Sequence, residues 1–166
     1  FVDRARVPVF VLGKGTNVLF SDDGFDGLVI KLGKVNTTLN DEGDCVEIGA
    51  SVAIVSLLKE AGNRGWAGFE RLAGVPGSVG GVVYMNAGTH LGEIRELVRS
   101  VEVYSLTQKE RRRLSGTELQ FSYRRNHFLQ PGDIVVSTRW EYEPAAPEWV
   151  KQKIQEILDR RKRTQP

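Results

Sequence analysis

Short stretches of branched apolar residues, bounded by turn-forming residues, recur through the first third of the chain. Segments 9–12, 28–32 and 46–48 fit this description, and each is flanked by glycine, proline or acidic turn residues. Such short runs are typical of β-strands rather than helices. Segment 9–12 is continuously apolar, so we expect this strand to be buried on both faces.

Two other segments have the period of amphipathic helices. Residues 52–61 form a broad apolar face, and we expect Ser51 to cap that helix and Gly62 to end it. The second helix is expected to begin at about Pro147, because proline is favoured in the first helical turn. Its apolar stripe consists of Val150, Ile154, Ile157 and Leu158.

Segments 98–106 and 134–142 alternate apolar and polar side chains, which is the period of half-buried strands. Strands therefore outnumber helices, and short turns join most of them. This order predicts a mixed α+β fold rather than a regular alternation of parallel strands and helices.

Composition narrows the class of protein further. The chain has 166 residues, which is about the size of one domain. Its 40% hydrophobic and 27% charged residues exclude a disordered, collagen-like or disulfide-framework chain. No apolar run is long enough to span a bilayer, so we expect no membrane partner. The one cysteine, Cys45, lies in an alternating stretch and favours a buried thiol in a reducing, cytoplasmic location.

Metal and nucleic-acid functions are both disfavoured. Besides Cys45, the chain has only His90 and His127, too few residues for a zinc cluster, so no metal is expected. Two basic runs, 111–113 and 160–163, lack the interleaved aromatic residues of nucleic-acid surfaces. We expect the first run to be a solvated strand edge and the second to be the cationic end of a helix.

Glycine is the unusual feature of the composition. The chain has 18 glycines, and nine of them fall within residues 62–92. One separate loop, 13–17, follows the expected strand 9–12. It is neither a dinucleotide fingerprint nor a P-loop, because Val18 and Pro8 stand where glycines are required. Its backbone N–H groups can nonetheless bind a phosphate, and an ordinary turn between strands is the alternative.

A second glycine loop spans residues 74–81. Its four glycines remove the β-carbons that would keep a phosphate from the backbone, and Ser78 is expected to cap a short helix whose free N–H groups favour an anion. Segment 85–88 then supplies small residues and one amide, suited to lying against a flat ring. Tight packing between a helix and a strand is the alternative. Two such loops together favour a dinucleotide with a pyrophosphate.

Catalytic side chains are harder to find. Tyr123 and Arg124 are adjacent, and a solvated cation–π pair is the simplest interpretation of them. Ser78 does not fit a nucleophile elbow, because Pro76 stands where that motif requires glycine. Hydrolase chemistry is therefore weakly supported.

These motifs together resemble the UDP-N-acetylenolpyruvoylglucosamine reductases (MurB) of peptidoglycan synthesis. Segments 11–19, 74–81, 85–88 and 121–124 carry the match in family order, and residues 161–166 are similar to the family's helix end before its substrate-binding domain. The resemblance covers essentially the whole chain.

The resemblance implies a two-lobed α+β FAD-binding domain of the vanillyl-alcohol-oxidase (PCMH) type. Residues 1–33 would be the remainder of the first lobe, residues 34–146 the second lobe, and residues 147–166 the helix leading to a substrate-binding domain absent from this chain. We therefore expect a chain truncated at both ends. The implied cofactor-binding residues are Gly13, Lys14, Gly15, Thr16, Asn17, Gly77, Ser78, Gly80 and Gly81 at the pyrophosphate, Asn86, Ala87 and Gly88 near the isoalloxazine, and Val136 near the adenine end.

The implied reaction takes hydride from NADPH through FAD to the enolpyruvyl double bond of a UDP-sugar. Arg124 matches the family's catalytic arginine, and its guanidinium is always charged and can fork onto a carboxylate. Tyr123 would orient it. Thr16 replaces a common serine and keeps the hydroxyl, whereas Asn126 stands where the family usually has serine and is left unassigned.

The family's proton-donating serine and its acidic partner belong to segments beyond Pro166, so the chain by itself is expected to be inactive. Two alternatives remain open. One is another flavin oxidoreductase of the same fold, such as an oxidase, although no histidine or cysteine for covalent attachment lies in the glycine loops. The other is a non-catalytic flavin-binding module.

Overall fold

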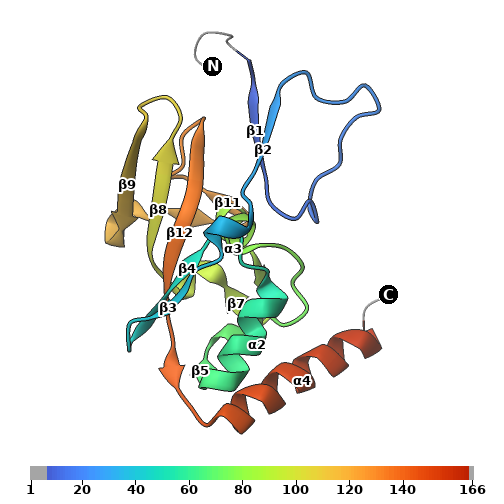
Figure 1. The fold of residues 1–166 in the computed structure, drawn as a ribbon. Coiled ribbons are helices and arrows are strands. Elements are labelled where there is room, and N and C mark those ends of the chain that lie inside the picture. The colour runs from blue at the N-terminus through green and yellow to red at the C-terminus, as the bar shows by residue number, and fades with distance from the viewer. Residues whose placement is uncertain (1–6, 165–166) are drawn as a thin grey trace.

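The structure, a computed structural model, describes residues 7–164; residues 1–6 and 165–166, including part of the helix end used for the resemblance, lie outside the described residues. Its centre is an antiparallel five-stranded sheet in the order β3-β4-β12-β8-β9 (Figure 1). These strands are β3 (Leu39–Asp41), β4 (Cys45–Gly49), β12 (Asp133–Glu141), β8 (Val98–Ser105) and β9 (Glu110–Ser115).

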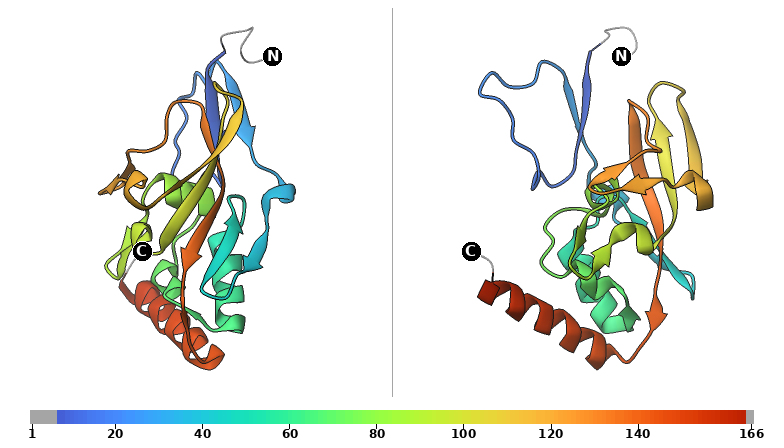
Figure 2. Two further views of the ribbon diagram at one scale, coloured as in Figure 1. Left: turned by 90° about the vertical axis from the view of Figure 1, so that its left-hand side faces the viewer. Right: turned by 180° about the vertical axis from the view of Figure 1, so that it is seen from behind.

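Within residues 7–164, three α-helices accompany the sheet: α2 (Ile54–Arg64), α3 (Val79–Tyr84) and α4 (Pro147–Thr164). Helices α2 and α4 pack against each other, and the two views of Figure 2 show α4 along the same end of the molecule as α2. Val150 of the predicted α4 stripe is fully buried, and the other stripe residues pack partly buried against the core. The mixed α+β architecture and the start of α4 at Pro147 are both confirmed.

Short elements complete the fold. The paired strands are β5 (Trp66–Ala67) with β13 (Glu143–Pro144), β6 (Gly88–Thr89) with β7 (Gly92–Glu93), and β10 (Phe121–Ser122) with β11 (Arg125–Asn126). The 3-10 helices are η1 (Lys34–Asn36), η2 (Phe69–Leu72), η3 (Ile94–Glu96) and η4 (Gly116–Glu118).

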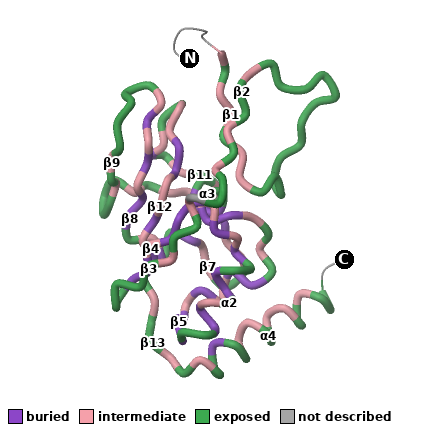
Figure 3. Tube along the Cα trace, viewed as in Figure 1, coloured by how far each residue is buried: buried purple, intermediate pink, exposed green. Residues whose placement is uncertain are grey.

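The first strands form a separate sheet. Strand β1 (Val9–Leu12) pairs in parallel with β2 (Leu28–Lys31), apart from the central sheet (Figures 1 and 2). The expectation that 9–12 is buried on both faces is wrong, since Val11 is 37% exposed and the other three residues of β1 are only partly buried. Figure 3 shows this pair as exposed or half-buried along its length, and the rings of Phe20 and Phe25 in the loop after β1 pack against Phe10.

The predicted ends of α2 are also wrong. The helix begins after Ala53 without a side-chain cap, and it ends at Gly65, whose left-handed backbone (φ 74°) donates its N–H to Ala61 O. Gly62 lies inside the helix, where a Cβ would come within 3.0 Å of Lys151 Cγ on α4. Gly62 therefore allows two helices to approach, and Gly65 ends the helix.

Of two expectations about charge and burial, the first, a solvated strand edge, is confirmed in part, and the second, a buried thiol, is confirmed. The first holds for Arg111 and Arg113, which lie on the edge strand β9 and pair with Glu102, but not for Arg112, which is partly buried and pairs with the buried carboxylate of Asp133. Cys45 is buried, and desolvation together with its hydrogen bond to Glu42 raises the pKa of its thiol. In residues 7–164, no helix is both long and apolar enough to cross a membrane.

Candidate functional site

The two glycine loops meet in space although they are about 60 residues apart in the sequence. Thr16 Oγ1 in the first loop donates to Pro76 O in the second at 3.4 Å. A Cβ on Gly13 would lie 2.7 Å from Ser78 Oγ, and one on Gly77 would lie 3.4 Å from Thr16 Oγ1. The absence of these β-carbons lets the two backbones approach and leaves hydroxyl groups between them.

The second loop is anchored to the junction between β4 and α2. Val79 N donates to Val52 O and Gly80 N donates to Ala50 O, both at 2.9 Å. Two N–H groups at the start of α3 are thus already paired, so the expectation that this short helix presents them to an anion is wrong for these two residues. Ser78 does occupy the expected N-cap position, but its hydroxyl makes no capping hydrogen bond.

The two glycines of α3 face different surroundings. A Cβ on Gly80 would lie 2.9 Å from Ala50 Cβ, so this glycine allows the loop to pack on the end of β4. Gly81 is exposed, and a Cβ there would meet only Ser78 Oγ, at 3.6 Å. Gly81 therefore leaves open space beside the Ser78 hydroxyl, whereas Gly80 has a packing role that the sequence did not reveal.

The residues at this junction fit a dinucleotide. Ser51 Oγ is buried without a hydrogen-bond partner, between Ala50 and Val52, the two residues that hold the second glycine loop. Sequence reasoning gave Ser51 only a capping role. Val136 lies beside the same junction, because its carbonyl accepts hydrogen bonds from Ala50 N at 2.9 Å and Asn36 Nδ2 at 2.7 Å. Unpaired hydroxyls and open glycine backbone are the features that a pyrophosphate requires.

Lys14, Gly15 and Asn17 occupy the exposed surface of the first loop. Gly15 has a positive φ of 75°, so the loop turns back at a residue where other side chains are strained. A hollow of about 530 Å³ between α2 and α4 reaches Gly74 and Pro76 at the start of the second glycine loop, and a hollow of about 820 Å³ lies beside Phe121 and His127. Residues 13–17 and 77–81 line neither hollow. The glycine cradle is therefore an open surface rather than a closed pocket.

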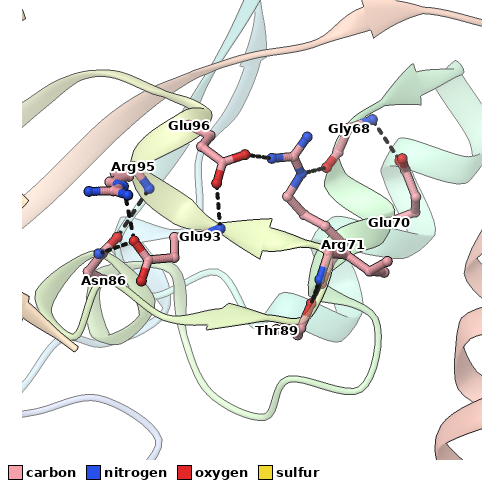
Figure 4. A network of polar contacts seen from close by, with 9 residues as sticks. Gly68, Glu70, Arg71, Asn86, Thr89, Glu93, Arg95 and Glu96 are labelled. Atoms are coloured by element: carbon pink, nitrogen blue, oxygen red, sulfur yellow. Dashed lines mark hydrogen bonds and ion pairs between the residues drawn. The ribbon is translucent and has the colours of Figure 1, made fainter. Parts of the chain in front are cut away.

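Asn86 follows α3 and holds a second part of the site together (Figure 4). It is fully buried with a left-handed backbone (φ 40°). Its Nδ2 donates to Glu93 Oε2 at 3.0 Å and Ser122 O at 2.9 Å, and its Oδ1 accepts from Arg95 N at 3.2 Å. Because these bonds occupy the amide, Asn86 shapes the segment with Ala87 and Gly88 instead of presenting its side chain to a ligand.

Charged residues extend this network away from Asn86 (Figure 4). Glu93 Oε2 pairs with Arg95 Nε at 3.0 Å, and Glu96 Oε2 pairs with Arg71 Nη1 at 2.7 Å. Glu96 Oε1 also accepts the Glu93 N–H at 2.9 Å. This backbone hydrogen bond, with the charge of Arg71 beside it, holds the pKa of Glu96 below its ordinary value against partial desolvation.

Tyr123 and Arg124 form the turn between β10 and β11, and the turn reaches the segment after α3. Arg124 Nη2 donates to Gly88 O at 3.1 Å, and its guanidinium carbon lies 5.7 Å from the centre of the Tyr123 ring. Tyr123 is 80% exposed. The structure therefore brings the predicted arginine next to the predicted ring-binding segment, with a charged group free to meet a ligand.

Comparisons with known proteins identify a family for the chain. A family model described as "FAD binding domain" matches residues 1–109. A protein named UDP-N-acetylenolpyruvoylglucosamine reductase from Gloeobacter violaceus is 41% identical over 164 residues, covering 98% of this chain and 55% of that protein. A protein of the same name from Caulobacter vibrioides is 40% identical over 163 residues, covering 96% of this chain and 54% of that protein. The chain spans about half the length of these curated relatives.

Solved structures are similar as well. The crystal structure of UDP-N-acetylenolpyruvylglucosamine reductase (MurB) from Thermus caldophilus matches with a TM-score of 0.85 and 36% identity, covering 99% of this chain and 60% of that chain. A Cu,Mo-CO dehydrogenase matches with a TM-score of 0.61 and 14% identity, covering 82% and 52%. A solvent-stable cholesterol oxidase matches with a TM-score of 0.60 and 14% identity, covering 86% of this chain and 31% of that chain. At such low identity the last two likenesses concern the fold alone.

The network around Glu96 predicts a pH-dependent stability. Glu96→Gln is expected to lower the free energy of unfolding at pH 7 by about 0.5–1 kcal/mol, because an exposed ion pair and one charge-assisted hydrogen bond are weakened. A carboxyl with a lowered pKa stabilises the fold above its ordinary value of 4.5 and loses that effect as the pH falls through the folded pKa. Urea unfolding at neutral and acid pH measures the difference in the free energy of unfolding between the wild type and Glu96→Gln. The same difference at both pH values would contradict the prediction.

The glycines of α3 predict opposite effects of one methyl group. Gly80→Ala is expected to lower the free energy of unfolding by about 1–3 kcal/mol, because the new Cβ presses on Ala50. Gly81→Ala meets only ordinary contact and is expected to be neutral or stabilising by up to about 1 kcal/mol. Urea denaturation compares the pair, and similar losses at both positions would show that the Gly80 contact with Ala50 is not the cause.

Proposed function

The chain belongs to the FAD binding domain family, in its UDP-N-acetylenolpyruvoylglucosamine reductase branch, and on this basis we propose that it is the flavin-holding part of an NADPH-dependent reductase. The fold is the vanillyl-alcohol-oxidase (PCMH) type that the resemblance implied. The proposed reaction reduces UDP-N-acetylglucosamine enolpyruvate to UDP-N-acetylmuramate, a peptidoglycan precursor, in the cytoplasm. The enzyme is thus a flavin-dependent oxidoreductase.

The meeting of the two glycine loops is the observation that carries this proposal. Gly13 to Asn17 would hold one side of the FAD pyrophosphate, and Gly77, Ser78 and Gly81 the other, because their backbones approach with hydroxyls and open space between them. Gly80 would act indirectly, through its contact with Ala50. Val136, beside the same junction, would lie toward the adenine.

Bound FAD would supply the hydride carrier between NADPH and the enolpyruvyl group. The chain's own contribution is electrostatic: the Arg124 guanidinium is exposed, permanently charged and positioned at Gly88 O. It would bind the substrate carboxylate and stabilise the negative charge that develops as the double bond is reduced. The Tyr123 ring beside it restricts its orientation.

The division of the chain follows from the same proposal. Residues 1–33 would belong to the first FAD-binding lobe, residues 34–146 to the second, and residues 147–166 would lead to a substrate-binding domain. The boundary at residues 33 and 34 falls at η1, between the separate β1–β2 pair and the central sheet. The relatives are about twice as long as this chain, which leaves room for such a domain. The UDP-sugar and NADPH would be its small-molecule partners.

Flavin binding is the first test. The purified chain is expected to bind FAD in a one-to-one complex, measured by visible absorbance and by quenching of flavin fluorescence. Gly81→Val is expected to lower FAD affinity at least tenfold, because its side chain enters the cradle beside Ser78. The thermal unfolding midpoint serves as the control for folding. A chain that takes up no FAD would refute the proposal, and FAD binding without substrate reduction in the full-length protein would favour a non-catalytic module.

Arg124 provides the second test. In the full-length protein, Arg124→Lys is expected to leave FAD affinity nearly unchanged and to slow reoxidation of the reduced flavin by the enolpyruvyl substrate by roughly 10²–10³-fold, about 3–4 kcal/mol. Lysine keeps the charge but loses the planar fork. Arg125→Lys, at the neighbouring exposed position on β11, is the matched control and should react at the wild-type rate. Wild-type reduction by Arg124→Lys would remove Arg124 from the mechanism.

A further inference from the structure

We propose that two asparagines, Asn126 and Asn86, are positioning residues that hold the Tyr123–Arg124 turn on the segment after α3. This inference rests on the proposed function of Arg124. The resemblance placed Asn86 near the isoalloxazine, but its side chain is fully buried and its amide is bonded within the chain. Asn126 had no assigned role. Asn86 donates a hydrogen bond to Ser122, just before the turn, and Asn126 donates one to Tyr84, at the end of α3.

Asn126 fixes the chain after the turn. Its Nδ2 donates to Tyr84 O at 2.7 Å, and its Oδ1 accepts from Leu129 N at 3.1 Å. Tyr84 is the last residue of α3, where backbone carbonyls lack partners within the helix. One amide therefore completes the end of α3 and ties strand β11 to it.

Asn86 fixes the chain before the turn. Its Nδ2 donates to Ser122 O, the residue directly preceding Tyr123, at 2.9 Å. Arg124 Nη2 adds a third bond, to Gly88 O, at 3.1 Å. The turn is thus held from both sides by hydrogen bonds to residues 84–88. In the sequence, Arg124 lies between Ser122 and Asn126, the two residues of the hairpin that take part in the asparagine contacts.

The turn requires such support. Strands β10 and β11 pair over only two residues each, and an isolated hairpin of this kind is marginal in water. Arg124 also has a left-handed backbone, φ 56°, and so does Asn86, φ 40°. Asparagine tolerates this region well, but arginine adopts it only where the surrounding structure enforces it. The hydrogen bonds of the two amides restrain the turn on both sides of Arg124 and so hold its backbone in this conformation.

The test uses the FAD-loaded, full-length protein and the variant Asn126→Asp. This change removes the donor to Tyr84 O and keeps an oxygen that can accept from Leu129 N. Substrate-driven flavin reoxidation is expected to slow about tenfold with FAD affinity unchanged, about 1.4 kcal/mol in the barrier. Asn63→Asp, an exposed position on α2, controls for the added charge and is expected to react at the wild-type rate.

A double-variant cycle separates positioning from a general loss of structure. If Asn126 acts through Arg124, then Asn126→Asp combined with Arg124→Lys should be little slower than Arg124→Lys alone, because the positioned group is already gone. The proposal would be overturned if the double variant were slowed by the product of the two single-variant factors, or if Asn126→Asp alone reacted at the wild-type rate.

Hydrogen exchange of residues 121–126 provides a readout independent of activity. Exchange is expected to be at least tenfold faster in Asn126→Asp than in Asn63→Asp, and equal rates would refute the asparagine contacts as the restraint. A wild-type protein that fails to bind FAD or reduce substrate would contradict the proposed function instead, and this measurement would still decide the positioning role.

Discussion

The close approach of backbones that carry no β-carbon is the constraint on which the candidate site depends. A Cβ on Gly13 would displace the Ser78 hydroxyl at 2.7 Å, and a Cβ on Gly80 would press on Ala50 Cβ at 2.9 Å. The first contact joins the β1–β2 pair to the loop before α3, and the second joins that loop to the end of β4. Larger residues at either position would separate the surfaces that together form the cradle.

Around Asn86, polar contacts rather than close backbone packing hold the parts of the site together. The two ion pairs around Asn86 each have one exposed partner, and such pairs contribute little individually. Their connection to a fully buried amide changes this, because an unpaired amide would be costly there. The buried Asn86 thus fixes the shape of the segment from Asn86 to Gly88, and the exposed Arg124 rests on that shape. Asn86 is buried within the fold, and the Arg124 guanidinium proposed to meet substrate remains accessible.

The local periodicity of the sequence predicted the strands that became β4, β8 and β12 and the helix that begins at Pro147. Those elements bury one face against a common core, so hydrophobic pattern and packing agree. The errors arose where packing depends on a distant segment. Strand β1 is apolar yet half-exposed, Gly62 faces α4 instead of ending a helix, and Asn86 bonds to Ser122. No pattern within a short window of sequence contains those partners.

Hydrophobic periodicity by itself determined that this chain is an α+β domain. Glycine content and motif order predicted two loops suited to a dinucleotide, because unusual backbone positions require glycine wherever they occur. Only the tertiary structure decided which glycines open a ligand cradle and which permit packing, since that depends on what each absent β-carbon would meet. It likewise decided that Asn86 and Asn126 support the Arg124 turn. An amide can bind a ligand or another part of the chain, and its role depends on which partner the fold brings within hydrogen-bond distance.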